Sequence, residues 1–199
     1  MANELQGMRV AFLVANEGIE QVELTEPWGA VIQAGGKAEL IAPQEGQAQA
    51  MNHLDKADRF AVDRTTKDVK PDDYDAVMLP GGVANADQLR MDGPAVDFVR
   101  RMFQAGKPAA VICHGPWALV EADVVRNRTL TSWPSLQTDI RNAGGEWVDR
   151  EVQVCPGGPN VLVSSRKPDD LPKFCAAMID AFEKARPRDR AGVSGVSGV

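Results

Sequence analysis

The sequence predicts a doubly wound α/β fold, in which helices cover both faces of a mostly parallel sheet. Two observations predict it: short apolar runs alternate with longer segments of helical character, and glycine or proline separates most of them. Continuous apolar runs are typical of parallel strands that are buried on both sides. The chain has 199 residues, of which 44% are hydrophobic, enough for one domain with a sizeable core. We expect that domain to span residues 1–185.

The first half of the chain alternates strand and helix between glycines. Residues 8–15 are apolar apart from Arg9 and predict the first strand. Residues 22–35 predict a helix that a pair of glycines ends, and residues 38–42 predict the second strand. Residues 44–63 have no clean helical period, so we expect a small hairpin or excursion there. Residues 74–79 predict a third strand.

The second half repeats the alternation. Proline in the first turn and glycine after the last mark residues 94–105 as a helix, and a short apolar strand follows at 109–112. The remaining elements expected are a helix at 116–122, a strand at 129–133, a helix at 135–143, two strands at 147–154 and 161–165 joined by a turn, and a helix at 169–185. Residues 186–199 end in a Gly-Val-Ser repeat and are expected to form a mobile tail.

Charge and cysteine content restrict the class of protein. The net charge of −6 leaves no basic field for nucleic acid or an anionic membrane, so neither is expected as a partner. The apolar start is short and lacks a basic segment before it, which argues against a signal peptide or membrane span. The three cysteines are odd in number and widely spaced, which argues against a disulfide framework or structural zinc. We therefore expect a cytoplasmic protein with no metal and no organic cofactor.

The most informative segment lies where the strand at 109–112 ends in Cys113, His114 and Gly115. A strand, one residue on a sharp turn and a helix together form the layout of a nucleophile elbow. The turn exposes the side chain at the carboxyl end of the sheet, and the helix start favours a thiolate. The alternative is that Cys113 is a small buried hydrophobe.

Two further features fall on loops at the same sheet edge, where sites of such folds form. Residues 16–24 follow the first strand and carry several carboxylates, although Glu17 and Glu23 are also explained by the helix dipole. Gly81 and Gly82 follow the third strand, and their backbone amides could face a developing oxyanion. The alternative for this pair of glycines is a tight turn.

Taken together, these segments resemble the ThiJ/PfpI superfamily, within the class I glutamine amidotransferase-like group. The similarity covers about residues 8–182 and is closest to the PfpI-like intracellular protease and general stress protein branch. The segments that carry it are Ala15-Asn16-Glu17, Glu20-Gln21-Val22-Glu23-Leu24, Tyr74 to Gly82, Ala110 to Pro116, Thr131-Ser132-Trp133-Pro134 and Asn142 to Asp149.

The resemblance implies a flavodoxin-like three-layer sandwich that forms a homodimer or higher oligomer. It implies a nucleophilic Cys113, a nearby acid Glu20 that reaches the sulfur, and an oxyanion site from the backbone of Gly82 and His114. Family members are described as intracellular proteases, glyoxalases or deglycases, chaperones and peroxide-responsive stress proteins.

Electrostatics restrict the role of Glu20. An ionised carboxylate beside the sulfur of Cys113 would raise the thiol pKa by repulsion between like charges. Only a protonated Glu20 could donate a hydrogen bond to a thiolate or sulfinate, and that requires a carboxyl pKa raised by burial. We therefore expect a neutral Glu20.

The third member of a protease triad is in doubt. In the PfpI proteases that the sequence resembles, the residue after the cysteine is the base, and an acid from a neighbouring subunit orients it. Here Ala86 occupies that acid's position, and Asp87 follows one residue later. Asp87 could substitute after a local shift, and His114 could instead be a pocket-lining residue, as Trp117 and Trp133 are expected to be.

One activity is excluded, a second is disfavoured, and two functions remain. No histidine follows His114, which excludes a glutamine amidotransferase, and no Gly-x-Gly-x-x-Gly follows the first strand, which argues against a dehydrogenase. One hypothesis is a cysteine-dependent hydrolase or lyase that acts on small carbonyl, glycated or peptide substrates. The other is a non-catalytic stress sensor or chaperone in which Cys113 is oxidised to sulfenic and sulfinic acid. Cys155 and Cys175 are expected to be structural or incidental.

Overall fold

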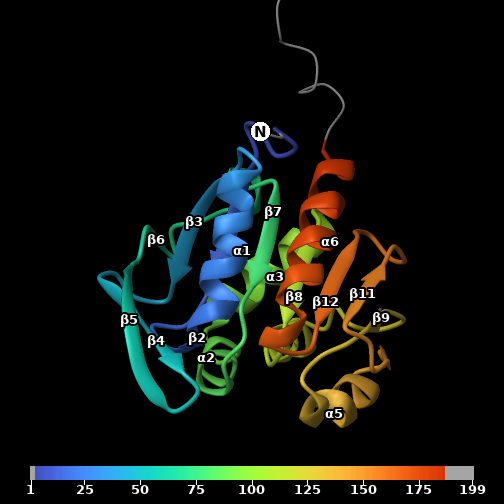
Figure 1. Ribbon diagram of the computed structural model, residues 1–199. Coiled ribbons are helices and arrows are strands. Elements are labelled where there is room, and N and C mark those ends of the chain that lie inside the picture. Colours follow the sequence, from blue (N-terminus) through green and yellow to red (C-terminus); the bar gives the residue numbers. More distant parts are fainter. Residues whose placement is uncertain (1–2, 187–199) are drawn as a thin grey trace, which may run out of the picture.

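A computed structural model describes residues 3–186, and a seven-stranded sheet forms its centre (Figure 1). The strand order is β11-β12-β8-β7-β1-β3-β6, and all neighbours are parallel except the antiparallel edge pair β11 and β12. This is the mostly parallel sheet that the sequence predicts. The expected tail at 186–199 lies, apart from Arg186, outside the described residues.

The observed elements agree closely with the expected ones. The strands of the main sheet are β1 (Arg9–Leu13), β3 (Lys37–Ala42), β6 (Arg64–Thr65), β7 (Ala76–Leu79), β8 (Ala109–Ile112), β11 (Val152–Cys155) and β12 (Leu162–Ser165). The other strands are β2 (Glu17–Glu20), β4 (Gln47–Asn52), β5 (Asp55–Ala61), β9 (Thr129–Leu130) and β10 (Glu146–Trp147). The helices are α1 (Gln21–Gln33), α2 (Val83–Leu89), α3 (Gly93–Gln104), α4 (Pro116–Glu121), α5 (Gln137–Asn142) and α6 (Leu171–Lys184).

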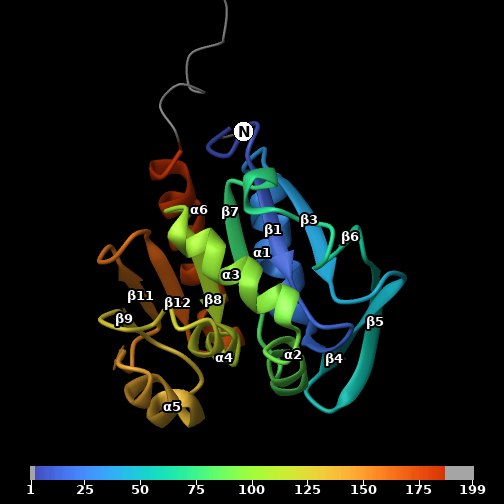
Figure 2. The same ribbon diagram turned by 180° about the vertical axis from the view of Figure 1, so that it is seen from behind.

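Helices cover both faces of the sheet because its strands are apolar on both faces. Along β1, Val10 and Phe12 belong to one core cluster and Ala11 and Leu13 to the other, and all four side chains are fully buried. Helices α1 and α6 pack side by side on one face (Figure 1). Helices α3 and α4 pack together on the other face, seen from behind in Figure 2. The sheet is therefore the middle layer of three.

The structure differs from the sequence prediction in several regions. Strands β2 and β6 and helix α2 were not predicted. Residues 129–133 and 147–154 were each expected to be one strand of the sheet, but β9 and β10 form a separate two-stranded parallel pair. The expected strand at 147–154 is divided, because the chain turns between β10 and β11. The expected excursion at 44–63 is the hairpin of β4 and β5, and β2 joins this hairpin through β4.

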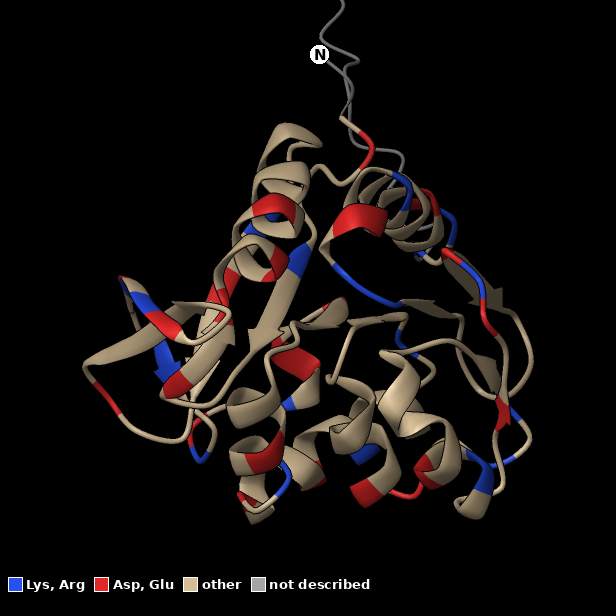
Figure 3. Ribbon diagram, turned by 60° about the horizontal axis from the view of Figure 1, so that its bottom comes forward, with Lys and Arg blue, Asp and Glu red and all other residues tan. Residues whose placement is uncertain are grey.

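The parallel strands all end at the lower edge of the sheet, which is turned toward the viewer in Figure 3. Basic and acidic residues are scattered over the elements in this view, without an extended area of either sign. The loops after β1, β7 and β8 meet at this edge, as expected for a doubly wound sheet. In the described chain, no helix is long and apolar enough to cross a lipid bilayer.

Candidate active site

Cys113 occupies a sharp turn directly after β8. Its φ is +59°, in the left-handed region that non-glycine residues seldom adopt. Its amide donates a hydrogen bond to the carbonyl of Ser165 at 3.1 Å, and its carbonyl accepts one from the Trp133 amide at 2.9 Å. Such a conformation costs about 1–3 kcal/mol and persists only where surrounding contacts hold it. The strand, turn and α4 helix thus form the elbow that the sequence predicts.

The carboxyl group that faces Cys113 belongs to Glu23, in the first turn of α1. Its side chain is fully buried. A Cβ added to Gly81 would overlap Oε2 of Glu23 and lie 2.6 Å from Cβ of Cys113, so the two side chains meet above this glycine. The contact with Cys113 affects the pKa of Glu23, yet no hydrogen bond of good geometry satisfies either carboxyl oxygen. Glu23 is therefore a buried acid directed at the thiol.

The sequence-based assignment of this role to Glu20 needs correction. Glu20 ends β2 immediately before the first residue of α1, and its Oε2 accepts a hydrogen bond from the His53 amide at 3.2 Å. Its carboxylate therefore lies toward the β4–β5 hairpin. Three residues further along, Glu23 lies on the inward stripe of α1 with Leu24, Pro27 and Val31. That helical spacing is the signal in the sequence that identifies it.

The carboxyl and the thiol both hold their protons more tightly than usual. Burial raises the pKa of Glu23 to about 8, with a further contribution from the negative charge of Glu20. Burial also raises the pKa of the Cys113 thiol, and the charge of an ionised Glu23 adds to this. The lowered thiol pKa expected from the sequence is thus reversed, because burial exceeds the influence of the short helix α4. At neutral pH Glu23 is protonated and able to donate.

His114 is in direct contact with the thiol. Its Nδ1 lies 3.2 Å from Sγ of Cys113, although the two residues are adjacent in sequence. The positive φ of Cys113 brings these neighbouring side chains together. Burial lowers the pKa of His114, so the imidazole is neutral at pH 7 and can accept a proton. Its ring lies 5.3 Å from that of Trp117 and 6.0 Å from that of Trp133, which fixes its orientation.

Two backbone amides face the sulfur from opposite loops. The amides of Gly82 and His114 both act to lower the pKa of the Cys113 thiol. Gly82 has φ +93°, and a Cβ at this position would collide with the carbonyl of Gly18. Only glycine therefore permits the loop after β7 to approach the loop after β1 so closely. These are the two amides that the resemblance assigns to an oxyanion site.

Asn85, which the sequence did not single out, joins these loops. Its side chain is fully buried in α2, and its amide nitrogen donates to the carbonyls of Pro80 and Gly81 at 3.1 and 2.9 Å. Its Oδ1 accepts a hydrogen bond from the Ala15 amide at 2.7 Å. Asn85 thereby holds the end of β1 against the glycine turn. No periodicity or motif in the sequence identifies it.

A cavity of about 790 Å³ opens over Cys113 and His114. Trp117 and Trp133 line it, as the sequence predicts. The carboxyl groups of Glu17, Glu20, Glu23 and Asp87 also line it, as does His53, and no lysine or arginine lines it in the described chain. Such a pocket accommodates neutral or cationic groups more readily than anions.

Asp87 lies at the cavity but does not complete a triad within this chain. Its carboxylate accepts hydrogen bonds from Arg90 at 2.7 and 3.1 Å, and in the described chain no hydrogen bond joins it to His114. The Arg90 guanidinium in turn lies 4.7 Å from the ring centre of Trp117. Asp87 and Arg90 therefore support the aromatic wall of the cavity.

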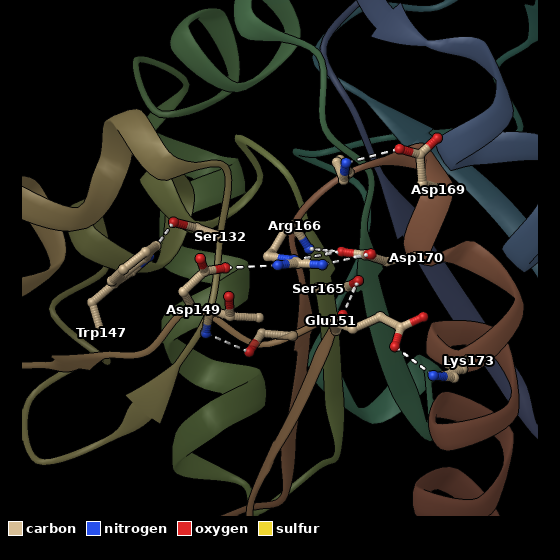
Figure 4. A network of polar contacts seen from close by, with 12 residues as sticks. Ser132, Trp147, Asp149, Glu151, Ser165, Arg166, Asp169, Asp170 and Lys173 are labelled. Carbon is tan, nitrogen blue, oxygen red and sulfur yellow. Dashed lines mark hydrogen bonds and ion pairs between the residues drawn. The ribbon is translucent and has the colours of Figure 1, made fainter.

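A network of ion pairs and hydrogen bonds lies around the segment that follows β12 (Figure 4). Arg166 bridges Asp149 at 2.7 Å and the buried Asp170 at 2.9 Å. This clamps the segment between β12 and α6, which carries Pro168 at the cavity wall. Ser165, whose carbonyl accepts the hydrogen bond from the Cys113 amide, is the last residue of β12 and directly precedes this segment. The turn at Cys113 is thus hydrogen-bonded to a strand whose following segment is fixed by ion pairs. In the described chain, no group of three His, Cys, Asp or Glu side chains is placed to hold a metal ion.

The elbow cysteine, the buried glutamate and the paired glycines define a class of protein. Residues 8–181 match the model of the DJ-1/PfpI family, and the chain belongs to this family. It is 40% identical to Deglycase PfpI of Pyrococcus furiosus over 82% of this chain and 93% of that protein. It is 38% identical to Protein/nucleic acid deglycase 2 of Escherichia coli over 83% of this chain and 92% of that protein. It is 35% identical to General stress protein 18 of Bacillus subtilis over 89% of this chain and 99% of that protein.

Solved structures show the same flavodoxin-like fold. A two-domain protein from Anabaena variabilis, with DJ-1/ThiJ/PfpI-like and ferritin-like domains, matches with a TM-score of 0.79 and 27% identity over 94% of this chain. The chain spans about half of that protein, 52% of its length. DJ-1 from Schizosaccharomyces pombe matches with a TM-score of 0.73 and 19% identity over 94% of this chain and 100% of that chain, which shows the fold alone.

Proposed function

We propose that the protein is a cysteine-dependent deglycase-type hydrolase that acts on small carbonyl compounds and their adducts with amines or thiols. The observation that carries the proposal is the buried Glu23 carboxyl, whose pKa of about 8 keeps it protonated beside the Cys113 thiol. The relatives named deglycases support the same class of activity. The cavity lacks basic groups in the described chain, which favours neutral or cationic adducts over anionic ones.

The geometry supports a definite division of roles. The sulfur of Cys113 adds to the carbonyl carbon, a C–S bond forms, and the carbonyl electron pair moves to oxygen. His114 Nδ1, 3.2 Å from the sulfur, accepts the thiol proton. The developing oxyanion accepts hydrogen bonds from the amides of Gly82 and His114. On the neighbouring carbinol carbon, the bond to the amine or thiol breaks as the hydroxyl becomes a carbonyl, and Glu23 protonates the leaving group and takes up the hydroxyl proton. The oxyanion then re-forms its carbonyl, the C–S bond breaks, the sulfur regains its proton from His114, and water hydrates the released carbonyl compound.

The test compares the wild type with Cys113→Ser and Glu23→Gln, and uses Cys175→Ser as the matched control. Each is offered the methylglyoxal adduct of N-acetylcysteine, with free methylglyoxal held constant while the adduct concentration varies. We expect turnover that rises with adduct, is lost in Cys113→Ser, falls about 10²-fold or more in Glu23→Gln, and is kept in Cys175→Ser. A rate that follows free methylglyoxal alone would contradict the deglycase assignment, and full activity of Cys113→Ser would contradict the cysteine mechanism.

A second candidate function uses the same groups without turnover. A protonated Glu23 can also donate to an oxygen of a sulfinate formed on Cys113, which would suit an oxidative-stress sensor. The name of the Bacillus subtilis relative favours a stress role. Absence of turnover on the adduct, on free methylglyoxal and on fluorogenic peptides, together with ready oxidation of Cys113 in intact-mass measurements, would select this function.

A further inference from the structure

A second cysteine lies beside a buried positive charge, away from the candidate active site. Arg128, just before β9, has only 2% of its surface exposed. Its Nε lies 3.4 Å from Sγ of Cys155, the last residue of β11. Cys155 is itself only 5% exposed. Two groups that are far apart in the sequence thus form one buried polar contact.

The other partners of Arg128 are all neutral. Its Nη1 donates to Oδ1 of Asn160 at 2.9 Å, and its Nη2 donates to the carbonyls of Asn160 and Cys155 at 2.8 and 3.3 Å. The ring of Phe103 lies 5.8 Å from the guanidinium carbon. Among the residues that the structure describes, no carboxylate lies within ion-pair distance of this guanidinium. The neutral oxygens solvate the charge but do not neutralise it.

A guanidinium stays charged in proteins, so burial cannot remove the positive charge of Arg128. A buried charge without a counter-charge is strongly destabilising. The titratable neighbour in contact with Arg128 is the Cys155 thiol, and a thiolate at 3.4 Å would supply the missing negative charge. We infer that Cys155 is held as a thiolate by Arg128 and is a second modification site, open to oxidation by hydroperoxides.

The surroundings of the sulfur agree with this assignment. Burial raises the pKa of Cys155, but the hydrogen bond from Arg128 and backbone interactions with Thr129 and Gly157 outweigh it, and the net shift is downward. In the thiol form, Sγ donates a long hydrogen bond of 4.0 Å to the carbonyl of Gly157. The neighbouring strand β12 presents the apolar Leu162 opposite Cys155, so Arg128 is the charged group that faces the sulfur. Cys175 differs, because burial raises its pKa to about 11.

A small oxidant can approach this cluster as far as Arg128, whose side chain contacts the sulfur. An open cavity of about 470 Å³ adjoins it, lined in part by Phe103, Arg128 and Pro159. In the reaction, the thiolate sulfur attacks one oxygen of hydrogen peroxide, the S–O bond forms and the O–O bond breaks. The departing hydroxide takes a proton from solvent and leaves as water, while the sulfur is oxidised to a sulfenic acid. The proposal is independent of any activity at Cys113.

The first test measures the charge state directly. Cys113→Ser combined with Cys175→Ser leaves Cys155 as the one cysteine of the sequence, and its thiolate absorbance near 240 nm is titrated in the folded protein. We expect a midpoint below the value of about 8.5 for a free cysteine. Arg128→Gln should move the midpoint upward by one unit or more, and Arg128→Lys should restore part of the shift. A Cys155 midpoint at or above 8.5 in the protein that keeps Arg128 would overturn the inference. This outcome can be read even if Arg128→Gln does not fold.

The second test follows the modification. The intact wild-type chain is exposed to a short pulse of hydrogen peroxide and then unfolded in the presence of dimedone, and each cysteine peptide is quantified by mass spectrometry. We expect labelling at Cys155 well above that at Cys175, and about a ten-fold fall at Cys155 in folded Arg128→Gln. Equal labelling of Cys155 and Cys175, or labelling of Cys155 only after unfolding, would refute the assignment.

Discussion

The raised pKa of Glu23 makes the stability of the folded protein depend on pH. Its pKa is about 8 in the folded protein and 4.5 in the unfolded chain, so the native state binds this proton more tightly. The associated stabilisation is complete below pH 4.5 and is lost as the pH rises through 8. Replacing Glu23 by glutamine keeps the shape and a donor but removes the titration. The variant should therefore gain stability over the wild type as the pH increases.

The size of the effect follows from the two pKa values. Between them, the free energy of unfolding of the wild type falls relative to Glu23→Gln by about 1.4 kcal/mol per pH unit. Summed from pH 5 to pH 8, the difference grows by about 3.5 kcal/mol. Because the side chain is fully buried, solvent screening does not reduce this value. The raised pKa of Cys113 keeps the thiol protonated over the same range.

The assay is urea unfolding at pH 5, 6, 7 and 8 for the wild type and Glu23→Gln, with free energies from linear extrapolation. Glu17→Gln, an exposed position at the same cavity, is the matched control and should stay within about 0.5 kcal/mol of the wild type. A difference for Glu23→Gln that does not change with pH would refute the raised pKa. The proton-donor role proposed for Glu23 would then lose its basis.

Three further substitutions test how the site is built. Gly81→Ala should abolish turnover, because the added Cβ overlaps the Glu23 carboxyl and lies 2.6 Å from Cβ of Cys113; the kcat of a variant that remains folded by circular dichroism checks this. Asn85→Ala removes three buried hydrogen bonds between two loops, so thermal unfolding should show a decrease of about 3 kcal/mol in the free energy of unfolding, and kcat should fall as well. An unchanged kcat would show that the two loops keep their arrangement without Asn85. Asp92→Ala removes the side-chain cap of α3 and should cost about 1 kcal/mol without a change in KM or kcat, since this cap lies outside the cavity.

Much of the fold could be predicted because the buried strands are recognisable in the sequence as apolar runs. Apolar runs at β1, β7 and β8 are continuous, and glycine or proline marks the neighbouring turns. The elements β9 and β10 were misplaced because a two-residue strand has too few positions to show a period. Whether such a pair joins the main sheet is decided by tertiary packing.

The candidate site was only partly predictable for a related reason. The elbow at Cys113 follows from local order along the chain, since strand, turn and helix are consecutive. The choice between Glu20 and Glu23 depends on the residue at which α1 begins, and boundaries are weakly encoded. The ion pair proposed between Arg128 and Cys155 joins residues 27 positions apart, so no local pattern reveals it.

The first and last residues that the structure describes lie at the same end of the molecule, which bears on how this protein can be tethered. The Leu5 amide donates to the carbonyl of Ala34 at the far end of α1, and α6 runs from the cavity wall to Lys184 at the same far end (Figure 1). The cavity opens at the other end of the sheet, where α1 begins. A linker, a second folded unit or a solid support joined at either end of the described chain would therefore leave the mouth of the cavity facing outward. Surface-immobilised protein should bind and release small molecules as freely as protein in solution.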